Sequence, residues 1–397
     1  MTGATLFYPS PPYLLNFLCC GLLFLKKYGM LFSFLRHAGL SSGIPCTESQ
    51  EGILKPRAKP FAVSVHMLTI LMKGAFFMNP VLEQISKIGL VPVIKLDDPN
   101  KAVDLATALK KGGIPVAEVT FRAAGADRAI AAIAKALPDV LVGAGTVITV
   151  DQVKAAVDAG AKYIISPGFD PEVVGYCIEH NIPITPGCTN PSEVSMATKM
   201  GLEVVKFFPA EAAGGLKVLK ALAGPFPKMR FIPTGGIGPQ NLNDYLAFDK
   251  IIACGGSWMV PGKLVDANDW DGITALAKEA VMTMLKPELR HVGINSADEG
   301  TALETAHMFS TVLGSCSEHT KSHFAGNNEI EVMKAVGVGK MGHIAIAVTS
   351  VARAMHYYAA QGLQFDESSI TYDEKGQPKF VYFKEEFGGF GVHLIKK

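Results

Sequence analysis

Short apolar runs that alternate with amphipathic segments are the feature that most constrains the fold of this 397-residue chain. Eight runs rich in β-branched residues are predicted to be strands: Val91–Leu96, Val116–Phe121, Val140–Val147, Tyr163–Ser166, Ile182–Pro186, Val204–Pro209, Arg230–Thr234 and Lys250–Gly255. Apolar residues recur at helical spacing between them, in segments such as Ala126–Leu137, Asp151–Ala159, Ser192–Met200 and Gln240–Ala247. Eight such units predict an α/β fold, a closed (β/α)8 TIM barrel of about 200 residues. An open doubly wound sheet is the alternative, which eight regular units disfavour.

The sixth predicted strand contains a lysine, Lys206, among apolar residues. Burying an ammonium group without a partner is costly, so proteins keep such a lysine where a neutral amine is useful. A neutral amine can attack a carbonyl group and form a Schiff base. The alternative is a strand-end lysine whose amine extends into solvent, and this segment alone favours neither.

Polar residues also lie at the carboxyl ends of other predicted strands, where (β/α)8 barrels place their active sites. In the second strand, the period of two puts Glu118, Thr120 and Arg122 on one face, so a carboxylate and a guanidinium can converge. Glu118 is the candidate for the proton transfers that amine catalysis needs. The alternative is a structural salt bridge from Glu118 to Arg122 or to Lys206. The planar guanidinium of Arg122 suits a carboxylate or a phosphate.

Glycine pairs follow the last two strands, within Thr234–Gly236 and Gly255–Ser257. In these barrels, phosphates bind where glycine-rich turns after the seventh and eighth strands expose backbone N–H groups. The Ser257 hydroxyl adds a further donor. A single glycine pair more often marks an ordinary turn, but two pairs at the expected strand ends favour a phosphate site.

Several motifs, in order along the chain, resemble the bacterial aldolases of 2-keto-3-deoxy-6-phosphogluconate (KDPG) and 4-hydroxy-2-oxoglutarate (KHG). The motifs are Glu118–Arg122, Val142–Val147, Ile165–Gly168, Lys206–Glu211, Gly224–Phe226, Pro233–Ile237 and Gly255–Trp258. The resemblance implies a class I aldolase that cleaves KDPG to pyruvate and glyceraldehyde 3-phosphate, and KHG to pyruvate and glyoxylate. It also implies a homotrimer that uses no metal or other cofactor for this reaction.

The same resemblance implies roles for individual residues. Lys206 would be the Schiff-base lysine and Glu118 the general acid/base. The implied substrate contacts are Arg122, Thr146 and the Pro167 backbone at the pyruvyl carboxylate, Phe208 at the pocket wall, and Thr234, Gly235, Gly236 and Ser257 at the phosphate.

A second class of function is a phosphosugar epimerase or isomerase barrel. Such enzymes usually use acid/base pairs, often with a metal at the barrel mouth, and they have no use for a buried lysine. No histidine lies at a predicted strand end between Val91 and Gly256, which favours the aldolase.

Residues 288–397 are predicted to form a separate, smaller α+β domain after the break at Lys286–Pro287, so that residues 78–287 make up the barrel domain. This segment contains an internal repeat in which each half begins with a strand led by a histidine, His291 or His343. Each half continues with a helix and closes with a matched strand: Ala302–Leu313 and Ile330–Lys334 in the first, Val351–Ala360 and Val392–Lys396 in the second. The pattern predicts two paired βαβββ modules.

Pseudo-twofold pairing of the halves would bring together four side chains of metal-ligand type: His291, Glu331, His343 and His393. Three imidazoles and a carboxylate suit a divalent transition metal such as Zn, Ni, Co, Fe or Mn. The order of these residues resembles the vicinal-oxygen-chelate (glyoxalase-like) superfamily, in which the first and last strands of each half supply four ligands. His393 departs from glyoxalase I, where a glutamate is usual. The alternative is a non-catalytic module whose histidines are ordinary strand residues.

The first 77 residues differ from the rest of the chain. The apolar stretch Leu14–Leu25 is shorter than the ~20 residues that span a bilayer, and its positive charge follows the apolar core, unlike that of a signal peptide. We expect residues 1–77 to be a disordered or non-native extension before Met78. A membrane anchor or a targeting peptide is the alternative.

The formal net charge of +1 argues against a nucleic-acid partner. The seven cysteines have no paired spacing, which is typical of a reduced, intracellular chain. We therefore expect a cytoplasmic protein that binds a small phosphorylated keto acid and neither nucleic acid nor membrane.

Overall fold

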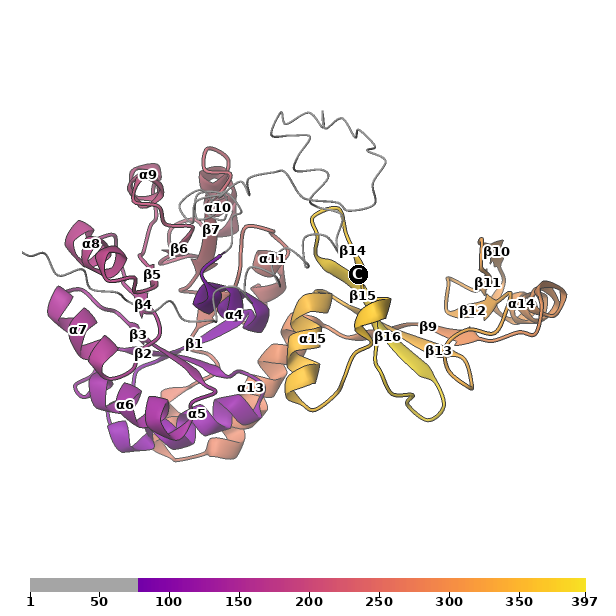
Figure 1. Cartoon of the computed structure of the whole chain (residues 1–397), viewed down its shortest axis with the longest axis horizontal. Helices are drawn as coiled ribbons and strands as arrows, with labels where there is room; N and C mark the ends of the chain where they lie inside the picture. The colour runs from indigo at the N-terminus through magenta and orange to yellow at the C-terminus, as the bar shows by residue number, and fades with distance from the viewer. Residues whose placement is uncertain (1–77) are drawn as a thin grey trace, which may run out of the picture. The chain divides into compact units, whose positions relative to one another are not determined.

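The computed structural model describes residues 78–397, so the predicted N-terminal extension lies outside the described residues. These residues form an α/β barrel followed by a domain built on a mixed β-sheet (Figure 1). Within the described range, no helix combines the length and the apolar character needed to cross a membrane.

Eight parallel strands form the barrel: β1 (Leu90–Ile94), β2 (Val116–Thr120), β3 (Leu141–Gly145), β4 (Ile164–Ile165), β5 (Ile184–Thr185), β6 (Val204–Phe207), β7 (Arg230–Pro233) and β8 (Cys254–Gly256). Ladder pairs join β5 through β1 to β8, and β6 to β7. Single parallel bridges, Gly187 with Lys206 and Thr234 with Gly255, connect these two groups of strands. The barrel is therefore closed, as the alternation of strands and helices predicts.

Helices surround these strands and also precede the first one (Figure 1). They are α4 (Pro80–Ile88), α5 (Ala102–Lys111), α6 (Ala126–Ala136), α7 (Val150–Asp158), α8 (Pro171–Glu179), α9 (Pro191–Lys199), α10 (Gly215–Ala223), α11 (Leu242–Leu246), α12 (Gly262–Asp266) and α13 (Trp270–Leu285), with the 3-10 turn η1 (Pro99–Lys101) before α5. Local sequence fixes several of their ends. At α9, Asn190 and Glu193 form a reciprocal capping box, and Pro191 occupies the first turn.

The C-terminal domain begins with β9 (Glu288–Ile294), directly after α13. The chain continues through α14 (Glu299–Leu313), β10 (Cys316–Glu318), β11 (Ser322–Ala325), β12 (Ile330–Met333), β13 (His343–Val348), α15 (Val351–Ala360), the 3-10 turn η2 (Glu367–Ser369), β14 (Thr371–Tyr372), β15 (Pro378–Tyr382) and β16 (Gly391–Lys396). The eight strands form one sheet in the order β10-β11-β12-β9-β13-β16-β15-β14. The sheet is thus symmetric in order about the β9–β13 pair.

Strand register places four polar side chains on one face of this sheet. Strand β12 runs parallel to β9 with Glu331 opposite Gly293, and β16 runs parallel to β13 with His393 opposite Ala345. The antiparallel β9–β13 pair sets His343 opposite Gly293, and Ala345 opposite His291. A Cβ on Gly293 would lie 2.0 Å from His343 Cε1, so this glycine makes room for the imidazole ring.

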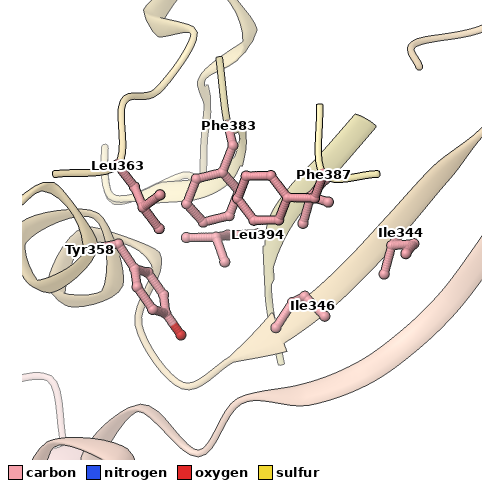
Figure 2. A pocket seen from close by; sticks show the side chains of 8 residues that line it. Ile344, Ile346, Tyr358, Leu363, Phe383, Phe387 and Leu394 are labelled. Atoms are coloured by element: carbon pink, nitrogen blue, oxygen red, sulfur yellow. The ribbon is translucent and has the colours of Figure 1, made fainter. Parts of the chain in front are cut away.

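The other face of the same sheet is apolar. Ile344 and Ile346 alternate with the histidine-side residues of β13 and line a cavity of about 320 Å³. Figure 2 shows Tyr358, Leu363 and Phe383 around the same cavity. One face of β13 is therefore apolar and lines a cavity, and the other is polar and carries the histidine side chain.

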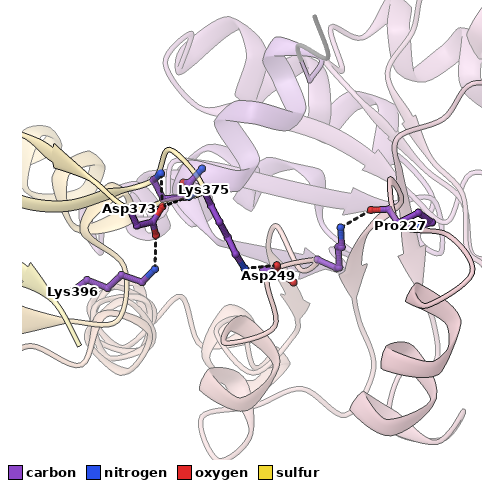
Figure 3. Close-up of polar contacts among 7 residues, drawn as sticks. Pro227, Asp249, Asp373, Lys375 and Lys396 are labelled. Carbon is purple, nitrogen blue, oxygen red and sulfur yellow. Dashed lines mark hydrogen bonds and ion pairs between the residues drawn. The ribbon is translucent and has the colours of Figure 1, made fainter.

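Contacts between the two domains involve α15 and the hairpin between β14 and β15. The Arg353 guanidinium donates hydrogen bonds to the carbonyl oxygens of Ser86 (3.3 Å) and Ile252 (3.0 Å), which precede β1 and β8. An exposed ion pair joins Lys375 to Asp249 at 2.8 Å (Figure 3). Arg353 therefore binds at the amino-terminal ends of the barrel strands, the end away from the predicted active site.

Candidate functional site

The barrel interior contains a buried pair of opposite charges. Lys206 Nζ on β6 lies 3.1 Å from Glu118 Oε1 on β2, and their side chains are 6% and 1% exposed. The Lys206 amine also lies 5.3 Å from the centre of the Phe208 ring, within range of a cation–π contact. Lys206 therefore does not extend into solvent, and one of the salt bridges considered for Glu118 is present.

Small residues of β3 make room for this pair. A Cβ on Gly145 would lie 2.3 Å from Glu118 Oε1, and a Cβ on Gly143 would lie 2.4 Å from the Tyr163 ring. Tyr163 is fully buried and donates a hydrogen bond to the Ala117 carbonyl at 3.1 Å. Burial, reinforced by the charge of Glu118, raises the pKa of Tyr163, so the phenol stays neutral beside the pair.

The other two polar residues predicted at the end of β2, Thr120 and Arg122, differ in whether their side chains are already hydrogen-bonded to the protein backbone. The Thr120 hydroxyl donates to the Ile94 carbonyl at 2.8 Å. Arg122 follows the end of β2; its Nε donates to Thr120 Oγ1 at 3.3 Å, and the Arg122 residue is exposed. Thr120 therefore anchors the strand end, while the guanidinium of Arg122 is the group with donors left to bind an anion.

Thr146 and Pro167 lie just beyond the carboxyl ends of β3 and β4, both half-buried. Thr146 has a φ of 56°, an uncommon left-handed conformation for a threonine. The Pro167 carbonyl lies against Gly187, where a Cβ would come within 2.1 Å of its oxygen. Backbone geometry is thus tightly constrained at both positions, as it often is at functional sites.

The turn after β7 packs against the turn after β6. The amides of Ala210 and Glu211 donate to the carbonyls of Thr234 (2.8 Å) and Gly235 (3.0 Å). Gly235 and Gly236 have φ values of 99° and 81°, which glycine adopts without strain. Among the described residues, no acceptor takes the N–H of either glycine. These two N–H groups are therefore available to an anion.

The turn after β8 lies next to the same place. A Cβ on Gly255 would lie 2.3 Å from Thr234 Oγ1, so the two glycine-containing strand ends are in close contact. Ser257 is exposed just after β8, and the buried Thr234 hydroxyl has no hydrogen-bond partner among the described residues. The predicted phosphate residues therefore come from adjacent turns.

Sequence reasoning missed two polar side chains inside the barrel, Tyr163 and Thr185. Thr185 ends β5, is 2% exposed, and has a hydroxyl for which the described part of the chain offers no hydrogen-bond partner. Both residues lie in short apolar runs, where a tyrosine or a threonine fits an ordinary strand. The register with β4, which places Thr185 opposite Ile165, is information that the run itself does not contain.

A second polar cluster lies in the C-terminal domain. Glu331 Oε2 lies 3.1 Å from His291 Nε2 and 3.0 Å from His343 Nε2, and the two Nε2 atoms are 3.1 Å apart. His393 is 2% exposed, its ring centre lies 5.3 Å from that of His343, and its Nδ1 has no hydrogen-bond partner within residues 78–397. Ser322 donates to the other oxygen of Glu331 at 2.6 Å. The four residues predicted to bind a metal are therefore close together.

Shifted pKa values keep Glu331 and His393 in this cluster unprotonated, so their lone pairs are free. Burial alone would raise the pKa of Glu331, but hydrogen bonds with His291, His343 and Ser322 hold it well below its usual value. Burial and then the neighbouring His343 and His291 lower the pKa of His393 to about 3. At neutral pH, Glu331 is ionised and His393 is neutral, which are the forms in which both residues bind metal ions.

A barrel with a buried amine beside a carboxylate is an arrangement suited to an imine-forming enzyme. The family model "KDPG and KHG aldolase" matches residues 81–276. The chain belongs to this family and is a class I aldolase.

Individual relatives agree with this assignment. The 2-dehydro-3-deoxy-phosphogluconate aldolase of Haemophilus influenzae is 46% identical over 207 residues, which cover 52% of this chain and 98% of the relative. The KHG/KDPG aldolase of Escherichia coli K12 is 48% identical over 48% of this chain and 90% of its own length. The family model ends at residue 276, before the C-terminal domain.

A solved structure extends the comparison to the chemistry. The KDPG aldolase of Legionella pneumophila, with pyruvate captured as a covalent carbinolamine intermediate, has a TM-score of 0.50 and 39% sequence identity. The match covers 51% of this chain and 98% of that structure. A carbinolamine is the adduct that precedes an imine, so the relative supports lysine-based chemistry over the epimerase or isomerase alternative.

Proposed function

We propose that the barrel cleaves KDPG to pyruvate and glyceraldehyde 3-phosphate, and KHG to pyruvate and glyoxylate, with Lys206 as nucleophile and Glu118 as general acid/base. The observation that carries the proposal is the 3.1 Å contact between the two side chains in a site almost closed to solvent. The names of the relatives from Haemophilus influenzae and Escherichia coli support the choice of substrates.

The reaction begins when the Lys206 ammonium group transfers a proton to Glu118, which leaves the amine neutral. The amine attacks the C2 ketone, and Glu118 returns the proton to the hydroxyl group of the resulting carbinolamine. That group leaves as water, which gives a protonated imine and an ionised Glu118. Glu118 accepts the C4 hydroxyl proton, directly or through a water, as the C3–C4 bond breaks. The imine nitrogen takes up the electron pair and forms an enamine, while the aldehyde leaves. Glu118 then returns a proton to C3, and hydrolysis releases pyruvate. The imine acts as the electron sink, so these steps need no metal or other cofactor.

Substrate binding divides between the two sides of the mouth. Arg122, Thr146 and the Pro167 backbone hold the pyruvyl carboxylate, and Phe208 packs against the carbon chain. Thr234, Gly235, Gly236 and Ser257 hold the phosphate, which the unpaired N–H groups of the two glycines favour. The resemblance to the family supports these roles, as well as a homotrimeric, cytoplasmic protein in which residues 78–287 form the catalytic domain.

Borohydride reduction in the presence of pyruvate tests the imine. The full chain should gain the mass of one reduced pyruvyl group, and peptide mapping should place it on Lys206. Lys217, an exposed lysine on α10, serves as the internal control because its peptide should stay unmodified. Absence of the adduct, or an adduct on another lysine, would refute the assignment of Lys206.

The second proposed function is metal binding by residues 288–397, arranged as two paired βαβββ modules of the vicinal-oxygen-chelate type. The supporting observation is the convergence of His291, His343 and His393, whose ligand atoms lie within 4.8 Å of one another, next to Glu331. The Nδ1 of His393, which has no partner among the residues that the structure describes, and the ionised carboxylate fit a divalent transition metal. When bound, such an ion acts as a Lewis acid toward a carbonyl group or a water.

Metal content of the full chain tests this second proposal. Protein stripped with a chelator and reloaded with Zn, Ni, Co, Fe or Mn should retain about one equivalent after desalting, and His343→Ala should retain none. His307→Ala, a change on the exposed side of α14, provides the matched control. Equal retention by wild type and His343→Ala would leave only a structural role for the cluster.

A further inference from the structure

Glu211 lies against the glycine turn of the proposed phosphate site. Its amide donates to the Gly235 carbonyl at 3.0 Å. Its side chain packs on the next glycine, because a Cβ on Gly236 would lie 2.6 Å from Glu211 Cγ and 2.7 Å from its Cβ. The conformation of the turn therefore depends on where the Glu211 side chain lies.

Tyr245 on α11 holds that side chain in place. Its phenol donates a hydrogen bond to Glu211 Oε1. Tyr245 is 2% exposed, and burial followed by the charge of Glu211 raises its pKa, so the phenol remains a hydrogen-bond donor at physiological pH. A Cβ on Gly215 would lie 3.0 Å from Glu211 Oε1 and 3.2 Å from the Tyr245 hydroxyl, which leaves little space for the pair to rearrange.

The charge of Glu211 gives this contact a consequence for substrate choice. Glu211 is exposed, its Cβ and Cγ lie against Gly236, and the N–H groups of Gly235 and Gly236 suit an anion. A carboxylate free to rotate toward those groups would compete with a phosphate and repel it. The hydrogen bond from Tyr245 removes that freedom.

We propose that Tyr245 and Glu211 are positioning residues that set the preference of this aldolase for phosphorylated over unphosphorylated substrates. Tyr245 fixes the Glu211 carboxylate, and Glu211 fixes the Gly235–Gly236 turn. Neither side chain takes part in the imine chemistry at Lys206. The inference rests on the proposed function, because it assumes that the turn after β7 receives the substrate phosphate.

Kinetics with a phosphorylated substrate (KDPG) and an unphosphorylated one (KHG) test the proposal. Tyr245→Phe keeps the ring and removes the donor, so the KM for KDPG should rise about 5- to 10-fold with kcat within about twofold. The KM for KHG should stay unchanged. Tyr176→Phe, which removes a phenol from α8, is the matched control and should alter neither constant.

Glu211→Gln separates the charge from the packing. The glutamine oxygen still accepts from Tyr245 but carries no charge, so the KM for KDPG should equal or fall below that of wild type. Adding Tyr245→Phe to Glu211→Gln should then raise the KM by less than about twofold, because the freed side chain no longer repels phosphate. A rise as large as in the single Tyr245→Phe variant would show that charge is not the cause.

Other outcomes also decide the matter. Equal changes in the KM values for KDPG and KHG, or no change in either, would overturn the proposal. Cleavage of neither substrate by wild type would instead refute the proposed function. In that case, calorimetric titration with inorganic phosphate still tests the pair, because Tyr245→Phe should weaken phosphate binding by the same 5- to 10-fold and an unchanged affinity would refute it.

Discussion

The two buried polar centres of this chain differ in whether their charges balance. In the barrel, one ammonium faces one carboxylate at 3.1 Å, and both belong to the protein. In the C-terminal domain, Glu331 is the single carboxylate beside three imidazoles and contacts two of them, and the Nδ1 of His393 has no partner in the part of the chain that the structure describes. The first centre is complete without any added group, whereas the second has lone pairs that a cation would satisfy.

This difference shows how two sheet architectures make a site from isolated side chains. A closed parallel barrel directs the ends of β2 and β6 toward one interior, so two residues separated by 88 positions can meet as a pair. An open sheet instead needs neighbouring strands in fixed register, and the pseudo-symmetric order about β9 and β13 supplies two side chains of metal-ligand type from each side. The barrel is suited to covalent chemistry, and the open sheet to coordination.

The largest expected effect comes from removing the amine of the Lys206–Glu118 pair in the barrel. Lys206→Met should lower the rate of pyruvate formation by at least about 10³-fold, because a methionine side chain cannot form the imine. Pyruvate release can be followed by a coupled assay with both substrates. Lys217→Met, the control, should keep wild-type activity. Substantial activity in Lys206→Met would show that Lys206 is not the nucleophile.

The carboxylate of the pair should have a smaller effect. Glu118→Gln should lower kcat by about 10²- to 10⁴-fold, since proton transfer is slowed while the nucleophile remains. Borohydride should still trap pyruvate on Lys206, although more slowly. If trapping is lost completely while the circular dichroism spectrum is native, Glu118 acts on the nucleophile rather than on the substrate.

The C-terminal centre should respond to metal, and the barrel should not. A free metal concentration of about 100 times Kd should stabilise the native state by about 2.7 kcal/mol, seen as a higher melting temperature. The shift should disappear in His343→Ala and persist in His307→Ala. A chelator that abolished aldolase activity as well would show that the two centres are not independent.

Weakening the contact between the two domains should have the smallest effect on catalysis. Arg353→Met removes two hydrogen bonds to barrel carbonyls and should lower the free energy of unfolding by about 1 to 3 kcal/mol. Urea denaturation measures this change, with the exposed Arg290→Met as the control. The kcat/KM for both substrates should be unchanged, because Arg353 binds at the end of the barrel opposite the proposed mouth.

The order of elements and the two sets of polar residues could be predicted from sequence because each rests on a local pattern. Period two placed Glu118 on an interior face, and repetition paired Glu331 with His393. The extent of short strands could not be predicted in this way. The strand expected at Lys250–Gly255 is β8 (Cys254–Gly256), because Ile251 forms only an isolated bridge to Phe231.

Long-range contacts account for the other omissions. The bond from Tyr245 to Glu211 joins residues 34 positions apart. Glu211 ends the motif Lys206–Glu211, but Tyr245 lies outside the motifs, so the sequence does not reveal that the two side chains meet. Helix α14 begins at Glu299 rather than Ala302, because Asp298 caps it by accepting from the Thr301 amide. The apolar periodicity on which the prediction relied starts one turn after this cap.

The β9–β13 pair has a consequence for how the C-terminal domain assembles. His291 and Glu331 come from one side of this pair, and His343 and His393 from the other, so neither half has all four side chains. A slip of one residue between the two strands would turn one pair of side chains to the opposite, apolar face. The imidazoles therefore converge only when β9 and β13 pair in the native register. An ion that binds them would stabilise the chain with this register relative to mispaired forms.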